Sequence, residues 1–365
     1  MAPDVVADAA FDRHYRNLRQ VFLYVTDECN LRCIQCYYMP WLKTGHAEMP
    51  TDVLVALLGK FRALGAIKLS LLGGEPTLYG QAQGNEPIGF VVETARTMGF
   101  RYIRMVTNGL FPDTLLEDER LRLLDEITFS IDGDTAEMHD SLRGQGTFDR
   151  SVANVIRAVS CGHNVHITTC VHRGNVGRDE QNRYLLDCAI GWAAALGARL
   201  INFHPLFKMG IARDSWTGET NILPSEWNAV YQSIRERIDA GYYPIHVRIP
   251  QRFVTEPEFR QEPKRYGFCP VKLAERIEVH PNGQIHSCAL NNGTPVSVAA
   301  FSREDNGPVK IVWSSTRNEL REYPFDATID HPCAVMSAEF GELVPLCISF
   351  KPDQEEFIWK TVGLS

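Results

Sequence analysis

Three cysteines lie within eight residues near the start of the chain, where Cys29, Cys33 and Cys36 follow a short apolar run. A mononuclear zinc site usually draws its ligands from paired C-x2-C or C-x2-H units, and no second unit of that kind lies nearby. Three thiolates on one compact loop suit three irons of a [4Fe–4S] cluster, which needs four ligands. The spacing therefore predicts a cluster with one open iron, whose fourth ligand is a small-molecule cofactor.

A glycine pair and a carboxylate, Gly73, Gly74 and Glu75, follow the next apolar run. Glycine lets the backbone approach a ligand closely, and a carboxylate beside it suits a ligand ammonium group. Polar side chains also follow the next two apolar runs, at Asn108, Ser130 and Asp132.

Strand-like apolar runs alternate with amphipathic helical runs over about 190 residues, which predicts parallel strands joined by right-handed crossovers. The expected strands are 21–26, 67–72, 102–107, 127–132, 164–171 and 200–207. The expected helices are 51–65, 88–99, 114–125, 148–162 and 179–197, with a further one at 225–241. The predicted fold class is α/β, a partial (β/α)6 TIM-type barrel followed by a small α+β C-terminal extension. The motifs fall at the carboxyl ends of the strands, which is the working face of such a barrel.

The segments CNLRCIQCYY, LLGGEPTL, VTNG, FSIDGDTAEMHDSLRGQGTFD and CVHRGN resemble the radical S-adenosylmethionine (SAM) superfamily over about residues 20–210. The resemblance implies that SAM chelates the open iron and is cleaved to a 5′-deoxyadenosyl radical, which abstracts a hydrogen atom from the substrate. It implies that Gly73, Gly74 and Glu75 hold the SAM amino group. By the same resemblance, Ser130 and Asp132 contact the ribose, while Asn108 and Arg143 lie near the sulfonium and the carboxylate. The chain departs from the family at Gln35, where an aromatic or apolar residue is usual.

Four more cysteines follow the barrel, at Cys269, Cys288, Cys333 and Cys347. Residues 276–288 read as a hairpin that returns Cys288 toward Cys269, with its turn at 281–283. This arrangement resembles the twitch or SPASM extension, which implies one auxiliary cluster, expected to be [4Fe–4S], completed by Cys333 and Cys347. A zinc site or plain core cysteines are the alternatives. The expected units are 1–19, an N-terminal segment; 20–210, the barrel; 211–265, a linking helical region; and 266–365, the cluster-binding extension.

Strand alternation predicts which side chains enter the barrel lumen. The polar set in the fourth strand is Thr128, Ser130 and Asp132. By the same parity, the fifth and sixth strands direct Cys170, His172, Asn202 and His204 inward. A lumen thiol at Cys170 would donate a hydrogen atom to a substrate radical, as an epimerase requires; the alternative is a small buried residue. His172, Asn202 and His204 are candidate substrate contacts.

Composition excludes several function classes. The chain has 365 residues and a net charge of −8, from 37 Lys and Arg against 45 Asp and Glu, without a basic run that would favour nucleic acid. There is no apolar stretch of membrane-spanning length and no apolar signal region, so a cytoplasmic location is expected. Ten cysteines in such a protein favour metal ligands or core residues over disulfides.

Two enzymatic functions are open at this point. The first is a radical SAM enzyme that acts on a small polar metabolite, nucleoside or sugar-like, in natural-product biosynthesis, by dehydrogenation, epimerisation or rearrangement. The second is a maturase that crosslinks or epimerises a ribosomally made peptide. Both imply a reductant such as flavodoxin or ferredoxin. A non-catalytic metal-binding regulator is disfavoured by the GGEP and SIDG motifs and by the lack of a basic segment.

Overall fold

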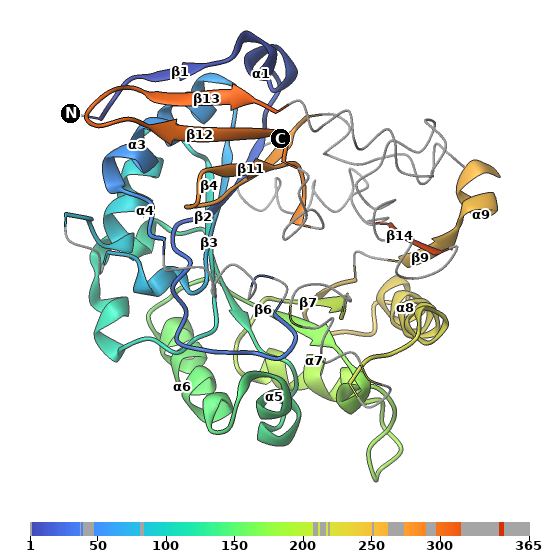
Figure 1. Cartoon of the computed structure of the whole chain (residues 1–365). Helices are drawn as coiled ribbons and strands as arrows, with labels where there is room; N and C mark the ends of the chain where they lie inside the picture. The colour runs from blue at the N-terminus through green and yellow to red at the C-terminus, as the bar shows by residue number, and fades with distance from the viewer. Residues whose placement is uncertain are drawn as a thin grey trace.

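A computed structural model describes residues 2–36, 38, 47–80, 84–206, 211, 217, 220–249, 252–261, 274–289, 297–314 and 343–346 (Figure 1). Most of its strands form one 12-stranded sheet in the order β1-β13-β12-β11-β10-β2-β3-β4-β5-β6-β7-β8. A separate two-stranded sheet pairs β9 (Arg252–Thr255) with β14 (Leu343–Leu346), and α9 (Glu256–Gln261) follows β9.

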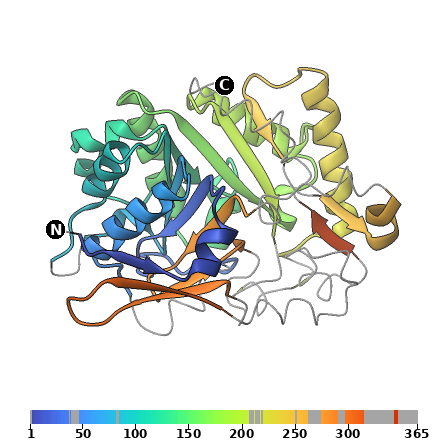
Figure 2. The same cartoon turned by 90° about the horizontal axis from the view of Figure 1, so that it is seen from above.

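The predicted barrel strands are confirmed, and each pairs in parallel with the next along the chain. They are β2 (Gln20–Tyr24), β3 (Lys68–Leu72), β4 (Tyr102–Thr107), β5 (Glu126–Ser130), β6 (Val165–Val171) and β7 (Leu200–Pro205). A further parallel strand, β8 (His246–Arg248), ends this side of the sheet. The sheet curves without closing, as the prediction of a partial barrel requires (Figures 1 and 2).

Helices lie outside the curved sheet in Figure 1. They are α3 (Thr51–Ala63), α4 (Ile88–Thr97), α5 (Ala136–Arg143), α6 (Thr147–Ser160), α7 (Leu185–Ala195) and α8 (Pro224–Asp239). The prediction of a helix over 114–125 is wrong, because two 3-10 turns, η2 (Asp113–Glu117) and η3 (Glu119–Leu123), occupy this segment. Asp118 has an extended backbone between them, and its carboxylate accepts hydrogen bonds from the backbone and side chain of Arg120. This local capping competes with a continuous helix.

The N-terminal segment and the C-terminal strands extend the same sheet. The hairpin of β10 (Arg276–Val279) and β11 (Gln284–His286) is confirmed, and β10 pairs in parallel with β2. Next come β12 (Ala299–Arg303) and β13 (Val309–Trp313), and β1 (Val5–Ala7) pairs with β13. Figures 1 and 2 both show β1 beside β13. The helix α1 (Ala9–His14) brings Phe11 against Trp313, with ring centroids 6.3 Å apart.

Side-chain parity separates the outer face of the sheet, which packs under the helices, from the inner face, which lines the cavity. All five residues of β2 are buried: Val21 and Leu23 join the large core beneath the outer helices, whereas Phe22 and Tyr24 pack in a separate cluster with Tyr38. Burying the apolar outer face contributes roughly 25 cal/mol per Å² of apolar surface. The inner face carries both apolar and polar side chains, among them Leu72, Val106, Thr128 and Ser130.

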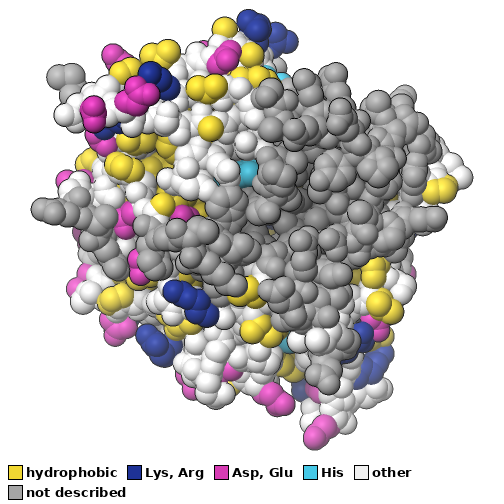
Figure 3. Space-filling model, viewed as in Figure 1, with side chains coloured by type: hydrophobic (Ala, Val, Ile, Leu, Met, Phe, Trp, Pro, Cys, Tyr) yellow, Lys and Arg dark blue, Asp and Glu magenta, His cyan; other side chains and the backbone are white. Residues whose placement is uncertain are grey.

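The described surface mixes charges of both signs on the face shown in Figure 3, without a run of one sign over the described elements. Within the described ranges, no helix has the length and apolar character needed to span a bilayer.

Candidate active site

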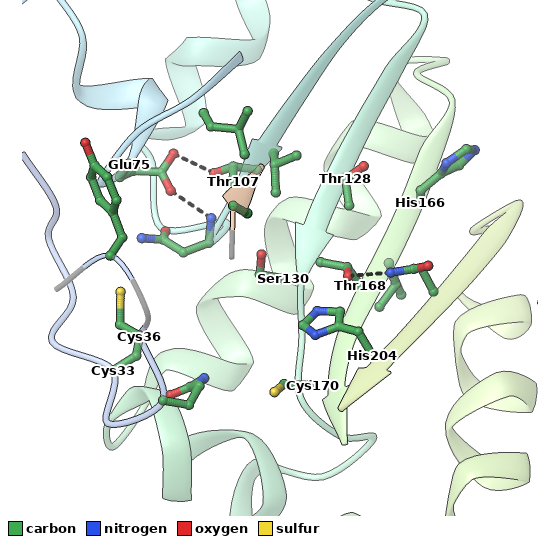
Figure 4. A pocket seen from close by; sticks show the side chains of 18 of the residues that line it. Cys33, Cys36, Glu75, Thr107, Thr128, Ser130, His166, Thr168, Cys170 and His204 are labelled. Carbon is green, nitrogen blue, oxygen red and sulfur yellow. Dashed lines mark hydrogen bonds between the residues drawn. The ribbon is translucent and has the colours of Figure 1, made fainter. Parts of the chain in front are cut away.

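A cavity of about 440 Å³ opens inside the curved sheet. The three clustered cysteines and residues 73–75 line one part of it. Figure 4 shows Cys33 and Cys36 on one side of this space, with Ser130, Thr168, Cys170 and His204 on the strands opposite. The structure therefore brings the predicted cysteine motif and the predicted polar strand residues to one cavity.

The cysteine loop follows β2 and is tied to α5, because Ile34 N–H donates to the carbonyl of Leu142 (3.0 Å). Burial raises the pKa of the Cys29 thiol to about 12, and the negative charges of Glu75, Cys33 and Cys36 add to the increase. Three half-buried thiolates beside a carboxylate need compensating positive charge. The irons of a [4Fe–4S] cluster supply it, so the donor set of this loop fits such a cluster.

No group of three or more Cys, His, Asp or Glu side chains among the described residues is arranged to hold a single metal ion. Of the C-terminal cysteines, Cys288 is half-buried and lines the same cavity as the first three. The other predicted auxiliary ligands, Cys269, Cys333 and Cys347, lie outside the described residues.

The glycine pair lets the loop after β3 lie directly on the chain before Cys29. Gly74 N–H donates to the Thr26 carbonyl and Glu75 N–H donates to the Glu28 carbonyl, both at 2.7 Å. A Cβ atom on Gly74 would lie 2.2 Å from the Glu28 oxygen, and one on Gly73 would lie 2.7 Å from the Thr26 oxygen. Any side chain would therefore push the two loops apart. The glycines therefore make room for another backbone, and because both also line the cavity, their expected role toward a ligand stays a prediction.

Glu75 is fully buried and accepts four hydrogen bonds. Its Oε1 accepts from Thr77 N–H (3.1 Å), the Thr77 hydroxyl (2.7 Å) and the Thr107 hydroxyl (2.7 Å), and its Oε2 accepts from Asn108 N–H (2.7 Å). Figure 4 shows two of these bonds. Burial raises the pKa of Glu75, and the four donors oppose that increase. A carboxylate offers about four acceptor positions on its two oxygens, so Oε2 keeps an acceptor position for a ligand ammonium.

Asn108 connects this carboxylate to the cysteine loop. Its amide nitrogen donates to Asn30 Oδ1 (2.8 Å) and lies 3.9 Å from the Cys29 sulfur. Its amide oxygen accepts from Leu110 N–H (2.8 Å), which fixes the orientation of the side chain. Asn108 also lines the cavity.

Asp132 lies behind the cavity wall and is not among the cavity-lining residues. Its Oδ2 accepts from Arg143 Nε (2.6 Å) and Gln35 Nε2 (2.8 Å), and its Oδ1 accepts from Cys170 N–H (2.8 Å). Burial opposes ionisation, but Arg143 holds the pKa of Asp132 below its usual range. This carboxylate therefore joins the cysteine loop, α5 and β6, while its expected contact to the SAM ribose stays a prediction.

Arg143, the last residue of α5, lines the cavity between Asp132 and Cys33. The charge of Arg143 and a hydrogen bond from it partly offset the burial that raises the pKa of Cys33. Ser130 lines the cavity at the end of β5. Gln35, the departure from the family pattern, also lines the cavity, and its buried Oε1 has no hydrogen-bond partner.

The four residues in or beside β6 and β7 that were predicted to point into the lumen divide into two groups. Cys170, Asn202 and His204 line the cavity, and Asn202 Nδ2 donates to the Thr168 hydroxyl (3.2 Å), as Figure 4 shows. His172 does not line it, because β6 ends at Val171 and the chain turns into a 3-10 segment. Its Nδ1 accepts from Gly174 N–H (3.2 Å), so His172 caps that turn rather than facing the lumen.

Burial raises the pKa of Cys170 well above the usual value for a thiol and lowers the pKa of His204. Cys170 is therefore a protonated thiol at neutral pH. Asn202 contributes an amide oxygen that is buried and has no hydrogen-bond partner.

Charged residues of five strands also line the cavity, and the sequence did not single them out as a site. They are Arg104, Glu126, His166, Arg248 and Arg276. The parity rule indicates two of them, because Glu126 and His166 continue the polar sets of β5 and β6. Arg276 could not be placed this way, since only the pairing of β10 with β2 brings it to the lumen.

The sequence of this chain is similar to a known family and to several characterised proteins. Residues 23–182 match the family model of the Radical SAM superfamily. A GTP 3′,8-cyclase of Haemophilus influenzae is 24% identical over 294 residues, which cover 76% of this chain and 79% of the relative. The corresponding enzyme of Klebsiella pneumoniae is 26% identical over 301 residues, covering 78% and 83%.

The crystal structure of Streptococcus suis SuiB bound to S-adenosylmethionine is similar in fold, with a TM-score of 0.58 and 15% identity. The similarity covers 79% of this chain, and the chain spans 65% of SuiB. The α/β fold with an open parallel sheet is thereby confirmed.

Proposed function

We propose that this chain is a radical SAM enzyme that abstracts a hydrogen atom from a small polar metabolite. The observation that carries the proposal is the shared cavity. Three clustered thiols, the GGE loop and a wall of hydroxyl, amide and imidazole groups all line it. When bound, the [4Fe–4S] cluster and SAM supply the 5′-deoxyadenosyl radical chemistry.

The protein's own part is to bind, orient and exclude water. Cys29, Cys33 and Cys36 would hold the cluster. Glu75 Oε2 would accept from the SAM ammonium, because its second acceptor position is open. Arg143 places a positive charge beside Cys33, and Asp132 fixes the position of that charge.

The chemistry of the lumen supports a small hydroxylated substrate. Thr128, Ser130, Thr168, Asn202 and His204 offer hydrogen bonds suited to a nucleoside or sugar. The curated relatives named above are cyclases of GTP, a nucleotide, and their similarity extends over three quarters of this chain. We propose Cys170 as a hydrogen-atom donor to the substrate radical, with the oxidised sulfur restored by the reductant.

An auxiliary cluster is part of the proposal. Its support is that Cys288 faces the cavity at the end of the β10–β11 hairpin. Cys269, Cys333 and Cys347 would complete its ligands. The variant Cys269→Ala should bind about four fewer iron atoms per chain. Unchanged iron would remove the auxiliary cluster from the proposal while leaving the first cluster in place.

The deciding experiment is anaerobic reconstitution with iron and sulfide, followed by an assay for 5′-deoxyadenosine release from SAM under dithionite. Release should be detectable without substrate and should rise when the substrate is added. Candidate substrates are nucleosides, nucleotides and sugar derivatives, with a peptide encoded by a neighbouring gene as the comparison. No release from a protein with a full cluster would overturn the proposal, and stimulation by the peptide alone would replace the metabolite with a peptide substrate.

A further inference from the structure

A histidine and a carboxylate form a pair on the cavity wall that the proposed cofactor contacts do not use. His166 Nδ1 lies 3.2 Å from Glu126 Oε1, and both residues are buried and line the cavity. They come from neighbouring strands, since His166 is the second residue of β6 and Glu126 is the first of β5. Figure 4 shows His166 on the strand that also carries Thr168 and Cys170.

Glu126 is an ionised and fixed acceptor. Its Oε2 accepts from the Tyr102 hydroxyl, and its Oε1 accepts from the Thr128 hydroxyl. A nitrogen of Arg104 lies 3.9 Å from Oε1. Burial opposes ionisation, but the neighbouring His166 and Arg104 hold the pKa of Glu126 well below its usual range. The carboxylate therefore keeps a negative charge and one orientation.

This carboxylate decides which ring nitrogen of His166 carries the hydrogen. An ionised carboxylate only accepts hydrogen bonds, so the hydrogen between the two side chains belongs to Nδ1. In the neutral imidazole, Nε2 then keeps its lone pair. None of the residues that the structure describes forms a hydrogen bond with Nε2. The pair therefore offers one proton acceptor to the cavity that His166 lines.

The acceptor lies one row of side chains away from a predicted SAM contact. Ser130 pairs with Thr168 across β5 and β6, and Thr128 pairs with His166. Successive inward side chains along a strand are about 6.6 Å apart. A substrate placed beside the expected ribose contact at Ser130 would therefore bring its next functional group to His166.

We propose that His166 is a catalytic base, whose Nε2 accepts the proton of a substrate hydroxyl, so that the hydrogen atom is abstracted from the carbon that bears this hydroxyl. The substrate class is then a secondary alcohol. This inference rests on the proposed function, because it assigns a reacting group and a residue to the same cavity.

Only a proton moves in the step assigned to His166. The O–H bond breaks, an N–H bond forms at Nε2, and the electron pair of the O–H bond stays on the oxygen. The Glu126 carboxylate balances the imidazolium that results, and no oxidant or reductant is consumed. Negative charge on the oxygen stabilises a radical at the carbon attached to it, so this carbon loses its hydrogen atom most readily.

A small alcohol tests the assignment without knowledge of the natural substrate. The probe is 2-propanol deuterated at its central carbon, and the comparison is its methyl ether with the same label, which lacks a hydroxyl proton. Each is added in excess to the anaerobically reconstituted full chain with SAM and dithionite. Mass spectrometry then measures the deuterium carried by the 5′-deoxyadenosine.

The measured quantity is the ratio of label from the alcohol to label from the ether. The labelled C–H positions of the two compounds are similar in strength, so the ratio should be near one without a base. With a positioned base, the alcohol should give at least about tenfold more label. A variant that merely disturbs the cavity would lower the label from both compounds and leave the ratio in place.

Three variants connect this ratio to the pair. His166→Phe keeps an aromatic ring without the acceptor, and should lower the ratio by at least about tenfold. Glu126→Gln should also lower it, because the amide cannot balance an imidazolium, and this variant serves if His166→Phe does not fold. His163→Phe alters a partly exposed histidine that does not line the cavity, and should leave the ratio unchanged.

The same samples separate this inference from the proposed function. Equal label from the alcohol and the ether, no label from either, or an unchanged ratio in His166→Phe would overturn the role of His166. Formation of 5′-deoxyadenosine in those samples would leave the proposed function standing. If no 5′-deoxyadenosine forms, both claims fail.

Discussion

The guanidinium of Arg276 lies over the ring of Phe22, with 3.9 Å between its Cζ atom and the ring centroid. Arg276 begins β10 in the C-terminal part of the chain, and Phe22 is in the first barrel strand. The contact therefore anchors the C-terminal hairpin to the barrel, beside the pairing of β10 with β2. It also places a buried ion pair, Arg276–Glu278, where β10 pairs with β2.

This ion pair predicts a non-additive mutant cycle. Arg276→Met should lower the free energy of unfolding by about 3–5 kcal/mol, because it leaves the fully buried Glu278 carboxylate without its cation. The double variant Arg276→Met/Glu278→Leu should recover most of that loss, since neither charge remains. Urea unfolding of both variants checks this, and additive effects would show that the pair is not coupled.

Loss of one clustered thiol should remove the first cluster. Cys29→Ala is expected to abolish SAM cleavage and to lower bound iron by about four atoms per chain. Cys161→Ala is the matched control, because Cys161 is exposed at the end of α6. Iron analysis and 5′-deoxyadenosine assays on both proteins are the measurements. Full iron content in Cys29→Ala would contradict the assignment.

Glu75→Gln should weaken both folding and SAM binding. An amide cannot accept from Thr77, Thr107 and Asn108 together, so one donor loses its partner at a cost of about 1–3 kcal/mol. The amide also lacks the negative charge that would attract the SAM ammonium. Thermal unfolding and SAM titration measure the two effects. Glu117→Gln, at an exposed position in η2, should change neither.

Stability should fall with acid below about pH 6.5, and His139 should account for part of the fall. Burial lowers the pKa of His139 to about 4, against an ordinary value of 6.5. Between these values the unfolded chain binds a proton that the folded chain excludes, so the folded state loses about 2 kcal/mol from pH 7 to pH 5.

His139→Asn removes this titration and keeps an acceptor for the Asp132 N–H, which His139 Nδ1 accepts at 3.2 Å. Urea unfolding at pH 7 and pH 5 should therefore show a smaller loss for the variant than for the parent chain. An equal loss in both proteins would assign the acid sensitivity to other groups, such as His246, whose pKa burial also lowers to about 4.

Cys170 is expected to deliver a solvent-exchangeable hydrogen to the substrate radical. Its thiol stays protonated because burial raises its pKa, and it lines the cavity. In deuterated buffer the product should carry deuterium, and Cys170→Ala should lose this label while still forming 5′-deoxyadenosine. Cys188→Ala, on the partly exposed α7 position, is the control. Retained label in Cys170→Ala would reject the role.

The cysteine motif and the order of strands and helices could be predicted from local patterns in the sequence. Cys29, Cys33 and Cys36 are close in the chain, so their shared loop follows from spacing alone. The alternation of strands and helices, and the parity that turns Ser130 and Cys170 inward, follow from local periodicities that a short segment already contains.

Which groups meet across the barrel could not be predicted from local patterns, because it depends on contacts between distant elements. The contact of Gly74 with Glu28, the three hydrogen bonds that Asp132 accepts, and the arrival of Arg276 beside Phe22 join residues far apart in sequence. Parity failed for His172 because this residue lies beyond the strand, which ends at Val171, where the backbone turns into a 3-10 segment. Local patterns can specify which way a side chain points within an element, but the meeting of two elements depends on the packing of the whole chain.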